Sequence, residues 1–174
     1  MTRKIFLNIA YIALFSALIF ILTYFIKIPY ALNNGYFNLS DALIIFSSIY
    51  FGPIVSIPSA IISTSLADLF SGCASSIIFT IIAKSLESLV AFIMFKFLFK
   101  QKYLKYILLY ISIIPMVLTY FVYYLVVNSF SLLPSLTSSS FDIIQGIIGV
   151  SLGLVLYLML NKIDVSNRYI YTRN

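Results

Sequence analysis

The chain of 174 residues has no histidine, no tryptophan and a single cysteine, and only 9% of its residues are charged. The lack of histidine removes the commonest general base and transition-metal ligand. One cysteine, Cys73, excludes an internal disulfide and cannot by itself form a thiolate metal site. The phosphate-binding motif GxxxxGK[ST] is absent as well, so any ATP-driven work must come from a partner. We therefore expect no catalytic residue, no metal site and no cofactor.

Apolar residues are abundant instead: 62% of the chain is hydrophobic and the mean hydropathy is +1.08. Soluble domains are nearer half apolar and a quarter charged, so the surplus apolar surface must face lipid. Six apolar segments predict six transmembrane helices at Ile5–Ile26, Leu39–Phe51, Ile54–Phe70, Ser76–Phe99, Tyr103–Val127 and Phe141–Asn161. A straight helix needs about 20 residues to cross the hydrocarbon core. The second segment is therefore short, and the predicted fold is an all-α integral membrane bundle forming one domain, residues 1–174.

Basic residues predict how this bundle lies in the membrane. With six spans, nine of them fall on one side: Arg3, Lys4, Lys96, Lys100, Lys102, Lys105, Lys162, Arg168 and Arg173. Lys27 lies on the opposite side, and Lys84 lies within a span. By the positive-inside rule, the basic side and both termini are cytoplasmic in the cell membrane. The net charge of +6 is then explained by topology and anionic lipid, without any nucleic-acid partner.

The longest connections, Lys27–Asn38 and Asn128–Ser140, are assigned to the outside by this topology. Small residues at helical spacing predict close helix contacts in lipid, where packing replaces the hydrophobic drive. Three such faces occur: Ala10, Ala13 and Ala17 in the first span, Ser59, Ser63, Ala67 and Ser71 in the third, and Gly146, Gly149 and Gly153 in the sixth. Contacts within the chain explain the second and third faces best.

A few polar residues lie inside or beside the predicted spans: Asn38, Asp41, Asp68, Lys84, Glu87, Asp142 and Gln145. A charged side chain at the centre of a span costs about 2.5–3.5 kcal/mol on insertion scales, so it is seldom kept without a role. The predicted topology puts all of these residues in the outer half of the membrane. This asymmetry predicts a polar binding site that opens outward, closed on the inner side by apolar packing.

Each polar residue also has a structural explanation. Lys84 and Glu87 lie three positions apart and could simply neutralise each other. Asn38 and Asp41 could cap the second helix, and Asp142 could benefit from the helix dipole at the start of the sixth. Asp68 lies near a helix C-terminus, where the dipole opposes it, so it needs a partner, for which Lys84 is the plausible cation. Several aromatic residues could stack on a flat ligand or belong to the interfacial belt: Tyr36, Phe37, Tyr120, Tyr123 and Tyr124.

Residues 35–42, GYFNLSDA, resemble the GYFNLGDA signature of an S-component family of energy-coupling factor (ECF) vitamin transporters. Further matches in the same order are Phe51-Gly52-Pro53, Ala67-Asp68-Leu69 and Lys84-Ser85-Leu86-Glu87, and the first span carries an AxxxA motif at Ala13 and Ala17. The chain departs from the family at Ser40 and Ser85, where glycine is usual, and at Asp142, where a neutral residue such as asparagine is expected.

The resemblance implies a bacterial membrane subunit that binds a vitamin with high affinity and docks on a transmembrane coupling protein with two ATPase subunits. It implies a binding site formed by Tyr36, Asn38, Asp41, Asp68, Lys84, Glu87 and Gln145, with Ala13 and Ala17 facing the coupling protein. The expected substrate is of the pyridoxine or hydroxymethylpyrimidine type, with riboflavin or a queuosine precursor as alternatives. Two other hypotheses are an ATP-independent facilitator and, less favoured without histidine, an intramembrane enzyme using Asp68, Glu87 and Asp142.

Overall fold

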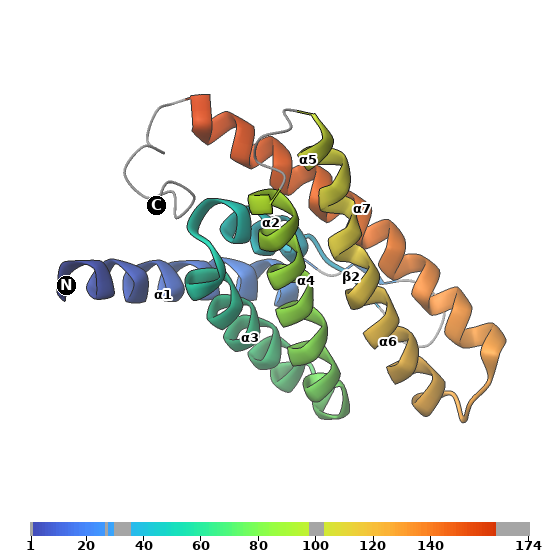
Figure 1. Ribbon diagram of the computed structural model, residues 1–174. Coiled ribbons are helices and arrows are strands. Elements are labelled where there is room, and N and C mark those ends of the chain that lie inside the picture. The colour runs from blue at the N-terminus through green and yellow to red at the C-terminus, as the bar shows by residue number, and fades with distance from the viewer. Residues whose placement is uncertain (1, 27, 30–35, 98–102, 163–174) are drawn as a thin grey trace.

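The computed structural model describes residues 2–26, 28–29, 36–97 and 103–162. The long helices are α1 (Thr2–Tyr24), α2 (Ser40–Phe51), α3 (Pro53–Phe70), α4 (Ile77–Phe97), α6 (Ile113–Val127) and α7 (Leu132–Lys162). Short elements are the 3-10 turns η1 (Ala74–Ser76) and η2 (Leu109–Ser112), the helix α5 (Leu104–Leu108), and the antiparallel strand pair β1 (Ile28–Pro29) and β2 (Tyr36–Phe37). The helices form one bundle (Figure 1), which confirms the predicted all-α fold.

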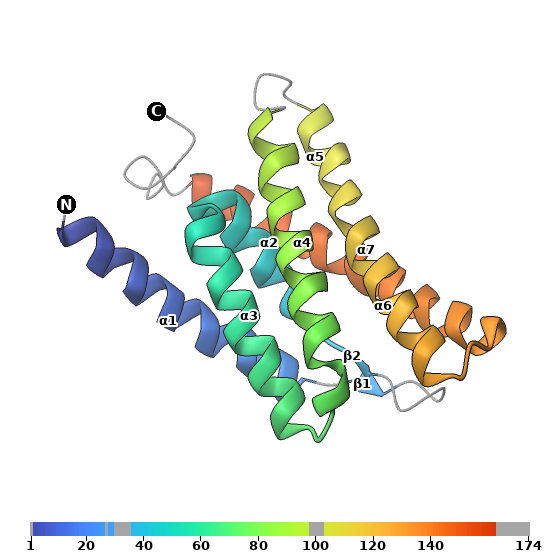
Figure 2. The same cartoon turned by 60° about the horizontal axis from the view of Figure 1, so that its bottom comes forward.

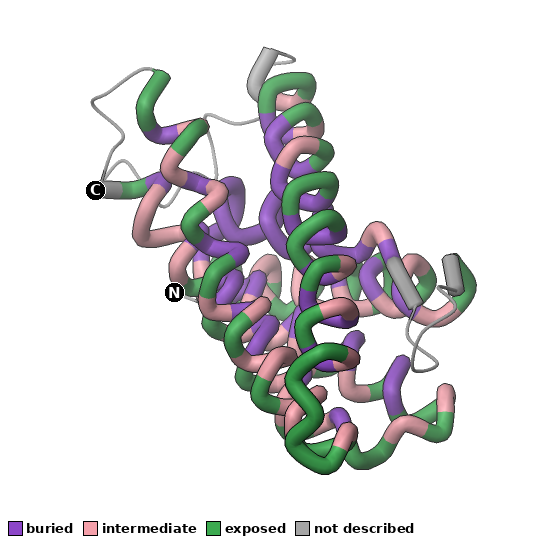
Figure 3. Tube along the Cα trace, turned by 90° about the vertical axis from the view of Figure 1, so that its right-hand side faces the viewer, coloured by how far each residue is buried: buried purple, intermediate pink, exposed green. Residues whose placement is uncertain are grey.

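Five helical segments of the described chain are long and apolar enough to cross a membrane: Arg3–Tyr24, Pro53–Phe70, Ala74–Lys96, Leu104–Val127 and Leu132–Leu160. Their outer surfaces carry large exposed apolar side chains, such as Ile78 and Val126, whereas buried positions face the bundle interior (Figure 3). The fourth of these segments, Leu104–Val127, joins α5, η2 and α6. Pro115 has no backbone N–H to donate, so the regular i→i−4 hydrogen bonding of the helix is interrupted where η2 passes into α6.

The second helix, α2, is short as predicted, with 12 residues. At 1.5 Å per residue it extends about 18 Å, too little to cross the hydrocarbon core. It packs against α1, α3, α4 and α7, and nearly all of its side chains are buried. Gly52, with φ of 85°, ends α2, and Pro53 takes the first position of α3, where a missing N–H costs nothing. α2 is therefore a short helix with polar residues at its N-terminal end, and it lies inside the bundle rather than against lipid.

The last helix differs from the prediction. α7 begins at Leu132, not at Phe141, so the connection predicted at 128–140 shrinks to a tight turn around Ser129 and Phe130, both of which have positive φ. The serines that suggested a loop bond to carbonyl groups one turn earlier: Ser135 Oγ to Ser131 O (2.7 Å), Ser139 Oγ to Ser135 O (3.0 Å) and Ser140 Oγ to Leu136 O (2.9 Å). Because the hydroxyls satisfy themselves on the helix, a serine-rich segment can remain helical.

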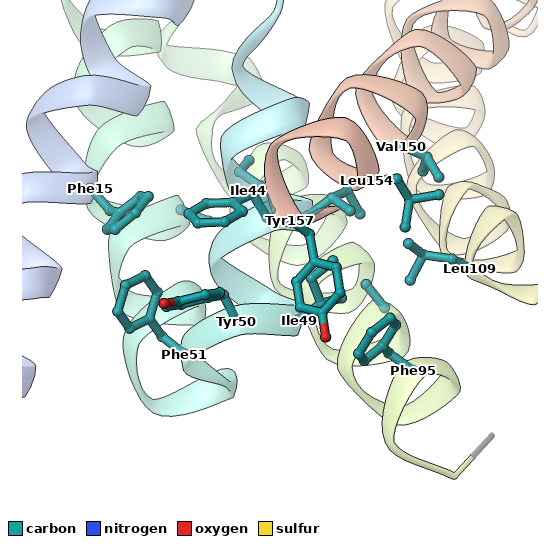
Figure 4. Packing of buried hydrophobic residues seen from close by; sticks show 14 of the residues in the cluster. Phe15, Ile44, Ile49, Tyr50, Phe51, Phe95, Leu109, Val150, Leu154 and Tyr157 are labelled. Atoms are coloured by element: carbon teal, nitrogen blue, oxygen red, sulfur yellow. The ribbon is translucent and has the colours of Figure 1, made fainter. Parts of the chain in front are cut away.

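The two ends of the bundle differ in composition. The start of α1, the end of α4 and the start of α5 lie at one end, and the strand pair and the α3–α4 and α6–α7 connections lie at the other (Figure 2). Near the first end, aromatic and aliphatic side chains form the hydrophobic core, among them Phe15, Phe51, Phe95, Leu154 and Tyr157 (Figure 4). In α2 and α7 the buried carboxyl groups precede this apolar stretch. Towards the second end, the core therefore gives way to polar side chains.

Glycines bring α7 against α2. A Cβ added at Gly149 would lie 2.5 Å from Asp41 Cβ, and one added at Gly153 would lie 2.8 Å from Ala42 O. The predicted close contact of this small-residue face is thus confirmed. Its consequence is that the backbone of α7 passes directly beside the first turn of α2, where Asp41 begins the polar region.

Candidate solute-binding site

Lys84 on α4 is the centre of the buried polar region. Its Nζ donates to Asp41 Oδ1 at 2.5 Å and to Glu87 Oε2 at 3.0 Å. All three side chains are buried, with Lys84 only 2% exposed. Lys84 and Glu87 share a helix face because they lie three positions apart, while Asp41 comes from the first turn of α2. The ion pairs therefore bridge two helices across the bundle interior.

The third contact of this ammonium group is weaker. Lys84 Nζ lies 2.9 Å from Met116 Sδ and 5.8 Å from the centroid of the Tyr120 ring, both on α6. An ammonium group has three protons, and a thioether sulfur is a weak acceptor. Lys84 therefore has two charged partners and one position that a better acceptor could take.

Gln145 on α7 completes this group of residues. Its Nε2 donates to Asp41 Oδ2 at 2.8 Å, and its Oε1 accepts from the backbone N–H of Asn38 at 3.1 Å. Asn38 Oδ1 in turn accepts from the N–H of Ser40 at 3.0 Å and from the Ser40 hydroxyl. Asn38 therefore makes an Asx turn into α2, one residue before the N-cap position that Leu39 occupies. These bonds tie the chain entering α2 to the middle of α7.

Asp68 lies in a separate group. Its Oδ2 accepts from Thr80 Oγ1 at 2.6 Å and from Ser76 Oγ at 3.0 Å, where α3, η1 and α4 meet. The prediction that Lys84 pairs with Asp68 was wrong, since the ion pairs of Lys84 go to Asp41 and Glu87. Thr80 also receives a long contact from Tyr120 OH at 3.5 Å, which brings this group next to the site.

Asp142 was expected at the start of a helix, but it lies well inside α7. It is buried and its Oδ1 receives only a long contact, 3.4 Å, from Tyr124 OH. The helix dipole acts within the first turn, so it does not stabilise this carboxylate. Asp142 is therefore a buried acid held by one weak contact.

The tyrosines of α6 join Asp142 to the Lys84 group. Tyr120 and Tyr124 are stacked with centroids 6.4 Å apart and an interplanar angle of 27°. Met116, Tyr120 and Tyr124 repeat every four residues, so they form one stripe on α6. Met116 was missed in the sequence analysis. Its spacing of four and eight residues from Tyr120 and Tyr124, which were named there, could have revealed it. Tyr123 packs on Phe79 instead (5.3 Å), and the side chain of Tyr36 lies outside the described residues.

On the other side of the bundle, the small face of α1 is uncovered. Ala10, Ala13 and Ala17 are exposed, whereas Phe15 and Ile19 on the same helix are buried in the core. Within the described part of the chain, this face therefore packs on no other helix. It leaves a flat strip of small side chains on the surface.

Long apolar helices, lipid-facing outer surfaces and an internal ionic group define a multi-pass membrane protein with a buried polar site. Residues 5–162 match the model of the family described as "ECF-type riboflavin transporter, S component", and the chain belongs to this family. It is thus an S component of ECF-type vitamin transport, a family of transporter subunits and not of enzymes.

One solved structure has a similar fold, the protein described under "Structure and mechanism of the S component of a bacterial ECF transporter". The TM-score is 0.72 at 24% sequence identity, and the alignment covers 94% of this chain and 98% of that one. At this identity the likeness concerns the fold alone. No curated protein matches the sequence.

Proposed function

We propose that the chain binds a small heteroaromatic vitamin between α2, α4, α6 and α7, as the substrate-specific subunit of an ATP-driven importer. The observation that carries this proposal is the buried pair of salt bridges from Lys84 to Asp41 and Glu87, together with the hydrogen bond that Gln145 donates to Asp41. Charged side chains are rarely kept inside a membrane bundle without a role. Buried charged side chains in a membrane bundle therefore indicate a solute-binding site.

Riboflavin is the first candidate substrate, because the family that the chain belongs to is described by this vitamin. A flavin ring offers carbonyl groups and a ring nitrogen, and either could replace the Met116 sulfur as the third acceptor of Lys84. The stacked pair of Tyr120 and Tyr124 offers a flat aromatic surface beside it. A substrate of the pyridoxine or hydroxymethylpyrimidine type is the second candidate, favoured by the signature at 35–42.

The exposed strip of Ala13 and Ala17 is the proposed contact with the transmembrane coupling protein, which carries two ATPase subunits. Small side chains allow two helices in lipid to approach closely, and this strip has no helix on it within the described residues. The excess of basic residues at one end of the bundle supports cytoplasmic termini.

The experiment is binding to the purified protein in lipid nanodiscs, with riboflavin followed by quenching of its fluorescence and pyridoxine by calorimetry. We expect one of them to bind with a dissociation constant below about 1 µM, equivalent to about −8.2 kcal/mol. If neither binds and no vitamin is retained on purification, the proposal fails. Uptake that persists in cells without the coupling protein and ATPases would favour the facilitator instead.

A further inference from the structure

The buried polar site contains more acidic side chains than basic ones. Four of the five acidic residues of the chain are buried in the bundle, and the fifth, Asp164, lies outside the described residues. Asp68 has its own hydroxyl donors. The other three, Asp41, Glu87 and Asp142, are left with Lys84 as the one buried ammonium group that the described residues place among them.

Two oxygen atoms of these acids have no hydrogen-bond partner in the described structure, Glu87 Oε1 and Asp142 Oδ2. Nine in ten or more of the buried polar groups of native proteins do have one, and a buried group without a partner destabilises the folded state. Glu87 at least shares its other oxygen with Lys84. Asp142, 7% exposed, has only the 3.4 Å contact with Tyr124. Asp142 is therefore the acid of the site with the fewest hydrogen bonds among the described residues.

Asp142 and its unpartnered oxygen belong to the same site. On α7, Asp142 lies one turn from Gln145, which bonds Asp41, the acid that pairs with Lys84. On α6, Tyr124 lies one turn from Tyr120, whose ring is near the Lys84 ammonium. Residues three or four apart on a helix have Cβ atoms about 5–6 Å from each other. Two independent helices thus place Asp142 beside the Lys84 group, and not at a separate surface.

We propose that Asp142 contacts the solute and accepts a hydrogen bond from its hydroxyl or amino group, so that the site takes the free vitamin and rejects its phosphate ester. This inference rests on the proposed function, because it assigns a specificity residue to the same site. A hydroxyl or amino donor satisfies the orphaned Asp142 oxygen. A phosphate brings further negative charge to three carboxyl groups and one ammonium group, and like charges in a region of low dielectric constant repel strongly.

The test compares riboflavin with riboflavin 5′-phosphate, and pyridoxine with pyridoxine 5′-phosphate, in nanodiscs. The proteins are the native chain, Asp142→Asn, and Ser140→Ala as the control, since Ser140 is exposed and bonds only within α7. We expect the native chain to prefer the free vitamin at least roughly 100-fold, as follows from mismatched buried charges. Asp142→Asn should weaken binding of the free vitamin and narrow this preference at least roughly tenfold, whereas Ser140→Ala should change neither.

Thermal unfolding without solute separates a binding role from a structural one. A solute-contacting Asp142 predicts that Asp142→Asn is as stable as the native protein or more so when empty, because it removes an unpaired buried charge, and that it gains less stability from the vitamin. A structural Asp142 predicts a less stable empty protein, which would overturn the inference.

The inference and the proposed function fail in different ways. Free vitamin bound with equal affinity for its phosphate ester, or with the same preference in Asp142→Asn, overturns the inference and leaves the proposed function intact. Absence of any vitamin binding overturns the proposed function, and the inference with it.

Discussion

Gly149 of α7 lies against Asp41 of α2 so closely that an added Cβ would be 2.5 Å from Asp41 Cβ. The same Asp41 holds Lys84 and is held by Gln145, one turn from Gly149 on α7. The packing of two helices and the geometry of the ionic group therefore depend on one pair of residues. A change in the packing of α7 against α2 should therefore alter the geometry of the ionic group.

Replacing Gly149 with alanine tests this dependence. The new methyl group meets the Asp41 Cβ and backbone, which cannot rotate away, so α7 must shift from α2. We expect a loss of about 1–3 kcal/mol of stability, as in overpacked cores, together with weaker vitamin binding. Gly146→Ala is the matched comparison, because there the atoms nearest to the methyl group belong to the Ile113 side chain rather than to Asp41. Equal vitamin affinity in Gly149→Ala and the native chain would contradict the prediction.

Replacing Lys84 with methionine tests the charge balance. It leaves Asp41 and Glu87 buried without their cation, and breaking a buried ion pair from one side costs about 3–5 kcal/mol. We expect a clearly lower melting temperature of the protein in detergent. Adding Asp41→Asn and Glu87→Gln should restore most of the stability but not the binding. A triple variant that is no more stable than Lys84→Met alone would show that the lysine acts through packing.

Replacing Gln145 with leucine tests the connection from α7 to the entry of α2. The change removes the donor to Asp41 Oδ2 and the acceptor of the Asn38 N–H. Each lost bond with a buried partner is worth about 1–3 kcal/mol. We expect reduced thermal stability and faster hydrogen exchange at the Asn38 amide, measured by mass spectrometry. Unchanged exchange there would show that Gln145 does not hold this segment.

Replacing Ala13 with tryptophan tests the proposed coupling face of α1. Ala13 is exposed, so the bulky side chain should not disturb the bundle, and vitamin binding by the purified subunit should remain. Vitamin uptake by cells that express the complete importer should fall at least roughly tenfold, because the large ring prevents close helix contact. The control is Ile114→Trp on α6, which is also exposed. Normal uptake with Ala13→Trp would place the contact elsewhere.

The number and order of the helices could be predicted from the sequence. The length of each apolar segment and the glycines and prolines that separate the segments are local features, which can be read directly along the chain. The short second helix and its end at Phe51 were predicted for this reason, and the structure confirms them. The start of α7 could not be predicted from composition. Ser135 and Ser139 look like loop residues, but on a helix their hydroxyls bond the preceding turn.

The sequence by itself determined that a few charged residues lie within an apolar bundle, since their positions in long apolar segments leave no other place for them. The partner of each charge was decided only by tertiary structure. Lys84 has Asp41 as its partner and not Asp68 because α7, through Gly149 and Gln145, fixes the first turn of α2 beside α4. Contacts between residues far apart in the chain depend on helix approach and rotation, which no local pattern specifies. The same packing leaves Asp142 inside α7 with an oxygen that has no donor in the described structure.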